Sequence, residues 1–451
     1  MAIKPADRLL SVIALAALGT AAAARLGIGG NWRAPAGESL QLTVQAAGED
    51  GLSPEDLETL VAGYPFHSEN STRYGQGPAA PDTARVNVTI NTKNAPADIL
   101  IAGDQSLTEG IEAGLYLPLD YQDFLQESLP ESPAFPVSSA FSAAGTWALP
   151  LVSAMDVLVY NIPLLREAGF DRPPRTRSDF LFYARTIKTQ GEKNRPPDGG
   201  KTGRYGFALG LSPQDPRGLG RDIYPWFYSS GLPLVKDGKP EFGGRDYTET
   251  LEFLFTLNRE GLIMPGSFDT TGADRIQDFV QGDVAMIIVS TRELRSIREK
   301  TEDGAIGITL IPHADSYTGK PVIGLSTWYA GISAASPHPG QARTLLQHLR
   351  EQSGLLAETL TLVPGAGGYS PYIAVDPLLD KAWGMYEAAI PIPNRSPGQN
   401  SSPYPGQTPS PDQTFYHEIT WLFHPDSPIT AEEAAQTIRQ SWGQWNEPEN
   451  L

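Results

Sequence analysis

Residues 276–289 read IQDFVQGDVAMIIV and contain a helix pattern followed at once by a strand pattern. Ile276, Phe279 and Val280 recur at the helical period before Gly282. Residues 284–289 are almost wholly apolar, as a strand buried on both faces should be. A helix that feeds a fully buried strand is one repeat of an α/β architecture, and this stretch therefore predicts that fold class.

The same alternation continues on both sides of this stretch. Upstream, Leu40, Leu42 and Val44 alternate with polar residues, and residues 86–90 and 98–102 form two further strand patterns. Helix patterns follow Pro163 and Thr176, cover residues 251–258 and 345–349, and return after Thr430. Strands that alternate with helices along the chain indicate layered α/β structure.

Length and charge narrow the class of protein. The chain has 451 residues, more than one core usually organises, so we expect two lobes. Hydrophobic residues make up 40% and charged residues 19%, which is typical of a soluble globular protein. The formal charge of −18 argues against nucleic acid or anionic lipid as a partner.

The N-terminus has the order of a secretory signal. Lys4 and Arg8 precede an apolar run over residues 9–18 and a small-residue tract over residues 21–24. We expect residues 1–24 to be a signal peptide and the protein to be periplasmic or extracellular. The alternative is an uncleaved membrane anchor, for which the run is short against the roughly 20 residues of a spanning helix. The chain has no cysteine, so neither a disulfide nor a lipid-bearing cysteine follows the signal.

Catalytic, metal and cofactor motifs do not stand out. The six histidines are scattered, which makes a zinc site improbable, and no G-x-S-x-G motif occurs. Residues 365–368 fit neither glycine-rich nucleotide fingerprint, so we expect no cofactor. A glycosidase needs two carboxylates across a cleft, and nothing among the 52 acidic residues singles out a pair. A carbohydrate-active hydrolase stays an alternative.

Residues 391–411 are rich in Pro, Gly, Ser and Gln. This composition favours a long extended loop over a helix or a strand.

Four ordered blocks resemble family 1 of the bacterial extracellular solute-binding proteins, the maltose- and sugar-receptor group of ABC importers. The strongest block joins WALP at 147–150 to LVYN at 158–161, AGF at 168–170 and PPRT at 173–176. The others are ADILI at 97–101 with GLYLPLD at 114–120, FVQGDVAM at 279–286 with IG at 306–307 and IP at 311–312, and GLSTWYAGISAAS at 324–336.

This resemblance implies a two-lobed periplasmic-binding-protein type II fold with a ligand cleft between the lobes and three inter-lobe crossings. Lobe one would take residues 38–150 and 326–365, and lobe two residues 151–325 and 366–447. The loop at 391–411 would belong to lobe two.

The resemblance also implies a set of ligand-binding residues from both lobes. Sugars bind flat aromatic rings and planar hydrogen-bonding side chains, and lobe one would supply polar contacts while lobe two supplies stacking rings. Trp328 and Tyr369 would lie near the cleft floor, or pack the hinge. The polar residues are Glu49, Asp50, Asp104 and Gln105, and the stacking rings are Tyr224, Trp226, Phe415 and Tyr416.

Two positions depart from the maltose-receptor pattern. Arg292 stands where a stacking tryptophan is expected, and Ala154 where a carboxylate is expected. Arg292 could stack on a sugar, bind a phosphate or carboxylate through paired donors, or be a solvated arginine at the rim. Maltodextrin is therefore doubtful as the ligand, and another oligosaccharide or an acidic or phosphorylated sugar stays open.

The function that these observations indicate is a non-enzymatic receptor of an ABC importer. We expect it to bind a carbohydrate by lobe closure, to act as a monomer and to deliver the solute to permease subunits. A third alternative is a surface interaction protein that derives from such a receptor and no longer binds a small ligand.

Overall fold

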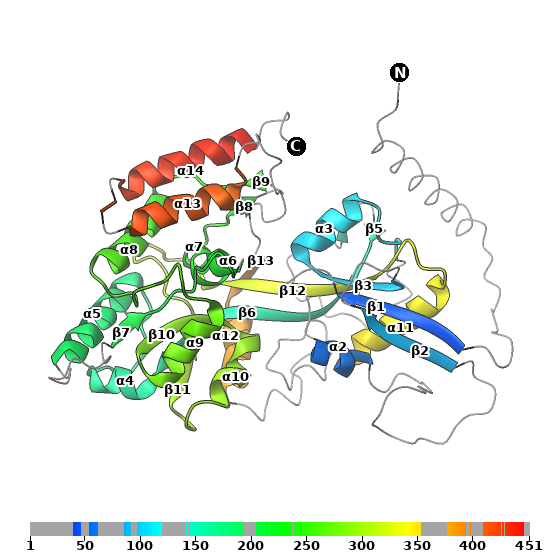
Figure 1. The fold of residues 1–451 in the computed structure, drawn as a ribbon, viewed down its shortest axis with the longest axis horizontal. Helices are drawn as coiled ribbons and strands as arrows, with labels where there is room; N and C mark the ends of the chain where they lie inside the picture. The colour runs from blue at the N-terminus through cyan, green and yellow to red at the C-terminus, as the bar shows by residue number, and fades with distance from the viewer. Residues whose placement is uncertain are drawn as a thin grey trace.

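The computed structural model describes residues 39–46, 54–61, 85–91, 97–119, 141–142, 145–193, 204–215, 217–236, 239–352, 377–393, 397, 409–424, 426–427 and 429–445. Two groups of helices and strands are joined by the long strands β6 (Leu149–Asn161) and β12 (Val322–Ile332), which run side by side between them (Figure 1). Residues 1–24, the predicted signal, lie outside the described residues.

Within the described residues, nine strands join into one mixed sheet in the order β2-β1-β3-β12-β6-β10-β7, with β11 beside β6 and β13 beside β12. The strands β1, β2 and β3 are parallel, whereas β12 is antiparallel to both β3 and β6. The remaining sheet strands are β1 (Ser39–Ala46), β2 (Arg85–Asn91), β3 (Ile99–Gly103), β7 (Tyr205–Phe207), β10 (Val284–Ser290), β11 (Ile306–Thr309) and β13 (Ile390–Pro393). Two small hairpins pair β4 (Phe141–Ser142) with β5 (Gly145–Thr146) and β8 (Val235–Lys236) with β9 (Lys239–Pro240).

Strand β6 belongs to both groups because its two halves have different neighbours. Residues 149–155 pair with β12, whereas residues 156–161 pair with β10 and β11. Its residues from Leu151 to Tyr160 are all buried, as expected of a strand covered on both faces. The predicted crossings at residues 150–151 and 325–326 fall in these two long strands. The predicted third crossing, near residue 365, lies outside the described residues.

The buried side chains separate into clusters that follow this division. One cluster joins β1, β3, the start of β6 and the far end of β12 to α2 (Pro54–Val61) and α11 (Pro339–Gln352). Two further clusters lie on the other side, and one of them begins at Met155 on β6 and includes Leu325 on β12. Each crossing strand therefore contributes side chains to the first cluster at one end and to a different cluster at the other end. The predicted residue ranges of the two lobes stay predictions.

The helices follow local signals that the sequence contains. Thr430 and Glu433 form the predicted capping box, with the Thr430 N–H donating to the Glu433 carboxylate at 2.8 Å.

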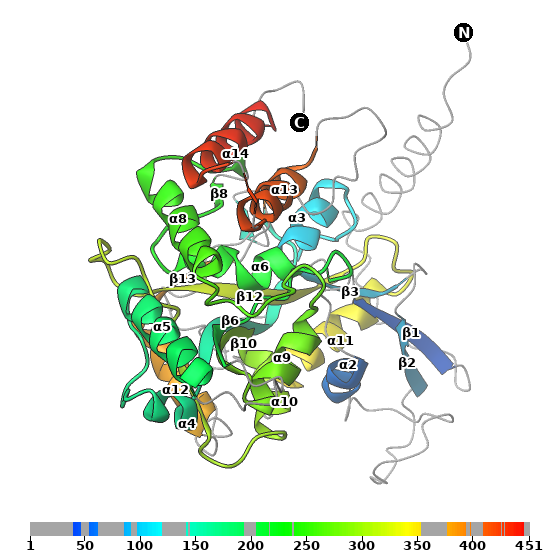
Figure 2. The ribbon, with the colours of Figure 1, turned by 60° about the vertical axis from the view of Figure 1, so that its left-hand side comes forward.

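Figure 2 shows α8, α13 and α14 on one side of β6 and β12, with α9, α10 and α12 on the other. The other helices are α3 (Asp104–Glu112), α4 (Ile162–Glu167), α5 (Arg177–Lys193), α6 (Gly218–Asp222), α7 (Tyr224–Tyr228), α8 (Arg245–Arg259), α9 (Gly272–Gln281), α10 (Leu294–Arg298), α12 (Pro377–Ala388), α13 (Pro411–Phe423) and α14 (Ala431–Trp445). Among the described residues, no helix combines the length and apolarity that a membrane span requires.

The prediction of an extended loop over residues 391–411 is wrong at both ends. Ile390–Pro393 form strand β13, parallel to β12, and Pro411 opens helix α13. Proline is compatible with both places, because an edge strand and the first turn of a helix each leave N–H groups outside the regular hydrogen bonds. Residues 394–396 and 398–408 lie outside the described part of the chain.

Asp98 joins three segments of the first group of elements. Its carboxylate accepts hydrogen bonds from the Thr43 N–H at 2.8 Å and from the Ser336 hydroxyl at 2.5 Å, and its side chain is buried. Its backbone N–H donates to the Thr43 carbonyl, and its carbonyl accepts from the Ser333 N–H. Asp98 thus connects β1, the start of β3 and the turn after β12.

We expect Asp98→Ala to lower the free energy of unfolding by about 3 kcal/mol, because the partly buried Thr43 N–H and the buried Ser336 hydroxyl lose their acceptor. Asp98→Asn should cost less, since the amide oxygen still accepts one of the two bonds. Chemical denaturation followed by circular dichroism measures both. Glu252→Ala, at an exposed position of α8, is the control, and equal stability of Asp98→Ala and the control would contradict the assignment.

Candidate functional site

The crossing strands, the end of β3 and the end of β10 meet in one region. Trp328 on β12 pairs with Gly103 at the end of β3 and with Val152 on β6. On the opposite side of β6, Ser290 at the end of β10 pairs with Asp156. Residues that follow β3 and β10 are therefore placed on either side of the two crossing strands.

A short 3₁₀ turn, η2 (Thr291–Glu293), follows β10 and is fixed at each of its residues. The Ser290 hydroxyl accepts from the Arg292 N–H, and the Glu293 carboxylate accepts from the Ser290 N–H at 2.9 Å. Thr291 is buried, and its hydroxyl accepts from the Met155 N–H at 3.2 Å. The turn is thus tied to strand β6, and the position of Arg292 follows from that anchor.

Arg292 and Trp328 contact each other across this junction. The guanidinium carbon of Arg292 lies 4.7 Å from the centroid of the Trp328 ring, in a cation–π contact. The Trp328 side chain is only 7% exposed and packs against the first core cluster. Two of the predicted site residues, one after β10 and one on the second crossing, are therefore brought together.

The crossing strands also share a buried hydroxyl pair. The Ser153 and Thr327 hydroxyls are 2.7 Å apart, and both side chains are buried. Directly after it, the register of β12 against β6 shifts between Trp328 and Tyr329, which marks a bulge. A bulge bends a strand locally, and this one lies within the first core, next to the place where the strands pass from one core to the other.

A network of buried charges lies beneath the turn after β10. Asp222 is fully buried and contacts two arginines, with its carboxylate 3.1 Å from Arg221 Nη2 and 3.3 Å from Arg275 Nε. Arg221 also forms a 2.7 Å ion pair with Asp215, which accepts from the Gly272 N–H at 2.8 Å. Each of these carboxylates thus lies against at least one arginine, which offsets the cost of removing its charge from water.

Asp156 adds a carboxyl group to this network from the middle of β6. Its side chain is 6% exposed. Burial raises the pKa of Asp156 well above its usual value, and the nearby Glu293 and Asp222 carboxylates raise it further, whereas Arg275 and Arg221 act in the opposite direction. Our sequence analysis missed this residue, although a lone carboxylate inside the apolar run LPLVSAMDVLVYN was the signal for it.

The polar residues predicted for lobe one are only partly described. Asp104 and Gln105 directly follow β3 and are the first two residues of helix α3, and their contact with a ligand stays a prediction. Glu49, Asp50 and Tyr369 lie outside the described residues.

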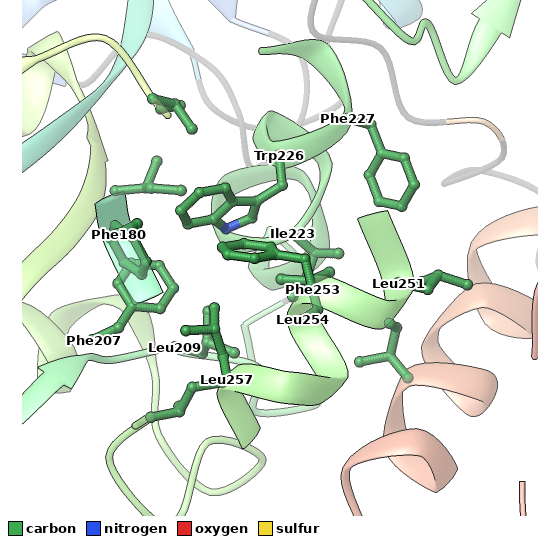
Figure 3. Close-up of a cluster of buried hydrophobic side chains, with 14 of the residues drawn as sticks. Phe180, Phe207, Leu209, Ile223, Trp226, Phe227, Leu251, Phe253, Leu254 and Leu257 are labelled. Atoms are coloured by element: carbon green, nitrogen blue, oxygen red, sulfur yellow. The ribbon is translucent and has the colours of Figure 1, made fainter. Parts of the chain in front are cut away.

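Three of the predicted stacking rings are core residues, and that part of the prediction is wrong. Tyr224, Trp226 and Phe415 are 0% exposed, and a stacking platform must present a ring face to the ligand. Trp226 packs edge-on against Phe180, at 5.0 Å between ring centroids, and lies tilted against Phe253 at 4.9 Å (Figure 3). Tyr224 packs on Phe415, and its hydroxyl donates to the Asp412 carboxylate.

Tyr416 and Ala154 occupy different surroundings. Tyr416 is half-buried, and its hydroxyl donates to the Leu211 carbonyl at 2.8 Å, so its polar end is already bonded within the protein. Ala154 is buried in the first core cluster and presents no polar group. Among the described residues, no group of three His, Asp or Glu side chains could hold a metal ion.

We expect Asp156→Asn to stabilise the protein at neutral pH. A carboxyl group whose pKa is raised in the folded state holds its proton longer there than in the unfolded chain, so stability falls as the pH rises above about 4. Asparagine resembles the protonated form and removes this loss. The gain in melting temperature should therefore be small near pH 4 and grow toward pH 8.

Asp171→Asn, at an exposed position, is the control and should leave the melting temperature unchanged at every pH. Destabilisation by Asp156→Asn at pH 8 would mean that Asp156 is ionised and paired in the folded protein.

Several solved structures have a fold similar to that of this chain. The GacH receptor of Streptomyces glaucescens, solved unliganded and with acarbose, is 17% identical with a TM-score of 0.65, and the alignment covers 90% of this chain and 98% of the receptor. Maltose-bound MalE3 of T. maritima is also 17% identical with a TM-score of 0.65, covering 90% and 99%. The cyclic alpha-maltosyl-1,6-maltose binding protein of Arthrobacter globiformis is 16% identical with a TM-score of 0.64, covering 90% and 99%. The likeness confirms the two-lobed α/β fold.

Sequence comparison places the chain in a family. A probable ABC transporter-binding protein of Deinococcus radiodurans is 24% identical over 207 residues, which are 45% of this chain and 46% of that relative. This chain thus matches about half the length of the curated relative. The profile of the family described as bacterial extracellular solute-binding protein matches residues 74–354, which is more than half of the chain. Together with the shared fold, this match confirms the resemblance of the sequence blocks, and the chain belongs to the bacterial extracellular solute-binding proteins.

Proposed function

We propose that this protein is the solute receptor of an ABC importer, which binds a carbohydrate between its lobes and hands it to membrane permease subunits. The observation that carries the proposal is the pair of continuous strands, β6 and β12, that two separate cores share. Two cores joined by paired strands can approach and separate without unfolding. A solute that contacts both lobes favours the closed arrangement, because only that arrangement makes both sets of contacts.

The ligand class rests on the proteins that resemble this chain. Acarbose and maltose are bound by two of the structures with the same fold, and the relative from Deinococcus is named as a transporter-binding protein. Of the predicted contacts, Arg292, Trp328, Asp104, Gln105 and Tyr416 remain in the proposed site, together with Glu49, Asp50 and Tyr369. We propose that the receptor lies outside the cytoplasm, in keeping with the family description. We also propose that it is monomeric.

The proposed receptor binds the sugar without cleaving it. The carboxylate of Asp222 is buried and that of Asp215 is half-buried, and both are held in ion pairs with Arg221, an arrangement that stabilises structure and does not offer a catalytic acid and base to a glycosidic bond. The receptor acts by binding and release.

We expect a carbohydrate ligand to raise the melting temperature of the purified protein saturably, because it binds the native state and not the unfolded chain. Thermal-shift titration against monosaccharides, oligosaccharides and acidic sugars measures this effect, and chromatography of the recovered sugar should show it unchanged. Cleavage of the sugar would favour a hydrolase. An unchanged melting temperature with every sugar would favour an interaction protein without a small ligand.

We expect Asp104→Ala to weaken binding of the sugar found in that screen by roughly ten-fold, the effect of losing one charge-assisted hydrogen bond. The melting temperature without ligand should stay close to that of the parent. Glu112→Ala, at the exposed far end of the same helix, is the matched control and should bind normally. Equal affinities of the two variants, measured by isothermal titration calorimetry, would remove Asp104 from the site.

A further inference from the structure

Strand β10 stops pairing with β6 where the turn η2 begins. The last paired residues of the two strands are Ser290 and Asp156. One further step in the same register would place Thr291 opposite Met155, but the backbone turns into η2 at Thr291 and leaves the sheet. The buried N–H of Met155 therefore needs an acceptor other than a carbonyl of β10.

The Thr291 side chain supplies that acceptor. Its hydroxyl oxygen accepts from the Met155 N–H at 3.2 Å, and both residues are fully buried. The two capping hydrogen bonds of the turn, between Ser290 and Arg292 and between Ser290 and Glu293, are local to it. The Thr291 bond differs from them, because it joins the turn to a crossing strand.

Met155 marks the place where β6 passes from one core to the other. It belongs to the core cluster that includes Leu325 of β12, whereas its neighbour Ala154 belongs to the first core cluster. The same turn also meets β12, through the contact of Arg292 with Trp328 at 4.7 Å. The turn η2 thus touches both crossing strands at the junction of the lobes, and the junction sets its position.

From this geometry we propose that Thr291 is a positioning residue of the proposed site, which holds the turn after β10 in place for the ligand through its bond to the Met155 N–H. Groups that contact a ligand keep their productive geometry only when residues behind them are locked by packing and hydrogen bonds. Because Thr291 is buried, it acts through the turn and not by contact with the sugar. This inference rests on the proposed function and adds a residue that acts from behind the same site.

Thr291→Val tests the bond, because valine keeps the branched shape and loses the hydroxyl. The probes are maltose, acarbose, cellobiose and glucuronic acid, and the one that the unmodified full chain binds most tightly is used for all variants. We expect Thr291→Val to weaken its binding about five- to ten-fold, the effect of losing one positioning hydrogen bond. Thr291→Ser should bind within about two-fold of the unmodified protein, because it keeps the hydroxyl. Isothermal titration calorimetry well below the melting temperatures measures these affinities.

A matched control separates positioning from a general loss of stability. Thr250→Val makes the same change at another fully buried threonine, whose hydroxyl accepts from Arg177 at 3.0 Å. Thr250 lies on α8, whose apolar side chains belong to a different core cluster from Met155. Both valine variants should have a lower melting temperature, and only Thr291→Val should bind the sugar more weakly. Thr291→Ala, which removes the same hydroxyl, replaces Thr291→Val if circular dichroism shows that the valine variant is unfolded.

The possible failures of this test are distinguishable. Equal affinities of Thr291→Val and Thr250→Val, or a Thr291→Ser variant that binds as weakly as Thr291→Val, would reject the positioning role and leave the sugar receptor intact. An absence of binding of all four probes to the unmodified protein would reject the proposed function along with this inference.

Discussion

The pairing of β6 with β12 is the constraint on which the rest of this structure depends. The two strands are antiparallel neighbours over residues 149–155 and 325–330, and each continues into a different set of partners. Because strand pairing joins them on both sides of a single register shift, relative movement of the lobes must come from bending and twisting of these strands. The bulge after Trp328 and the Ser153–Thr327 pair lie at the place where such bending would concentrate.

The same strands position the chemistry of the candidate site. Trp328 is on one crossing strand, and the turn that carries Arg292 is anchored to the other through Met155. Asp156 follows Met155 directly, and through it the network of Asp222, Arg221 and Arg275 reaches the junction. The proposed ligand contacts Arg292 and Trp328, the junction of β6 with β12 and the buried charges are therefore connected through the same two strands.

The features that could be predicted from the sequence are those that depend on neighbouring residues, such as a strand, an apolar helix face or a helix cap. The strand at 284–289, the apolar face of α5 and the cap at Thr430 follow from periodicity and hydrogen-bond stereochemistry within a few residues. The burial of Tyr224 and Trp226 could not be predicted, because burial is a tertiary property and the five-residue helix α7 is too short to show a buried face. Phe415 lies on the longer helix α13, and the rings that cover it, Tyr224 and Trp442, come from other segments. The contact of Arg292 with Trp328 joins residues 36 positions apart through the sheet, and no spacing rule in the sequence indicates it. Asp156 was visible in the sequence as a carboxylate among apolar residues, but its arginine neighbours come from other segments.

The bond between Asp98 and Ser336 joins positions 238 residues apart, and the first core cluster extends from Leu42 to Leu349. A ribosome makes the chain from its N-terminus, so three-quarters of the protein must emerge before this lobe has all of its buried surface. Contacts over such long separations also form slowly, because a large loop must close before they gain any energy. The nascent chain therefore spends most of its synthesis without a finished first lobe.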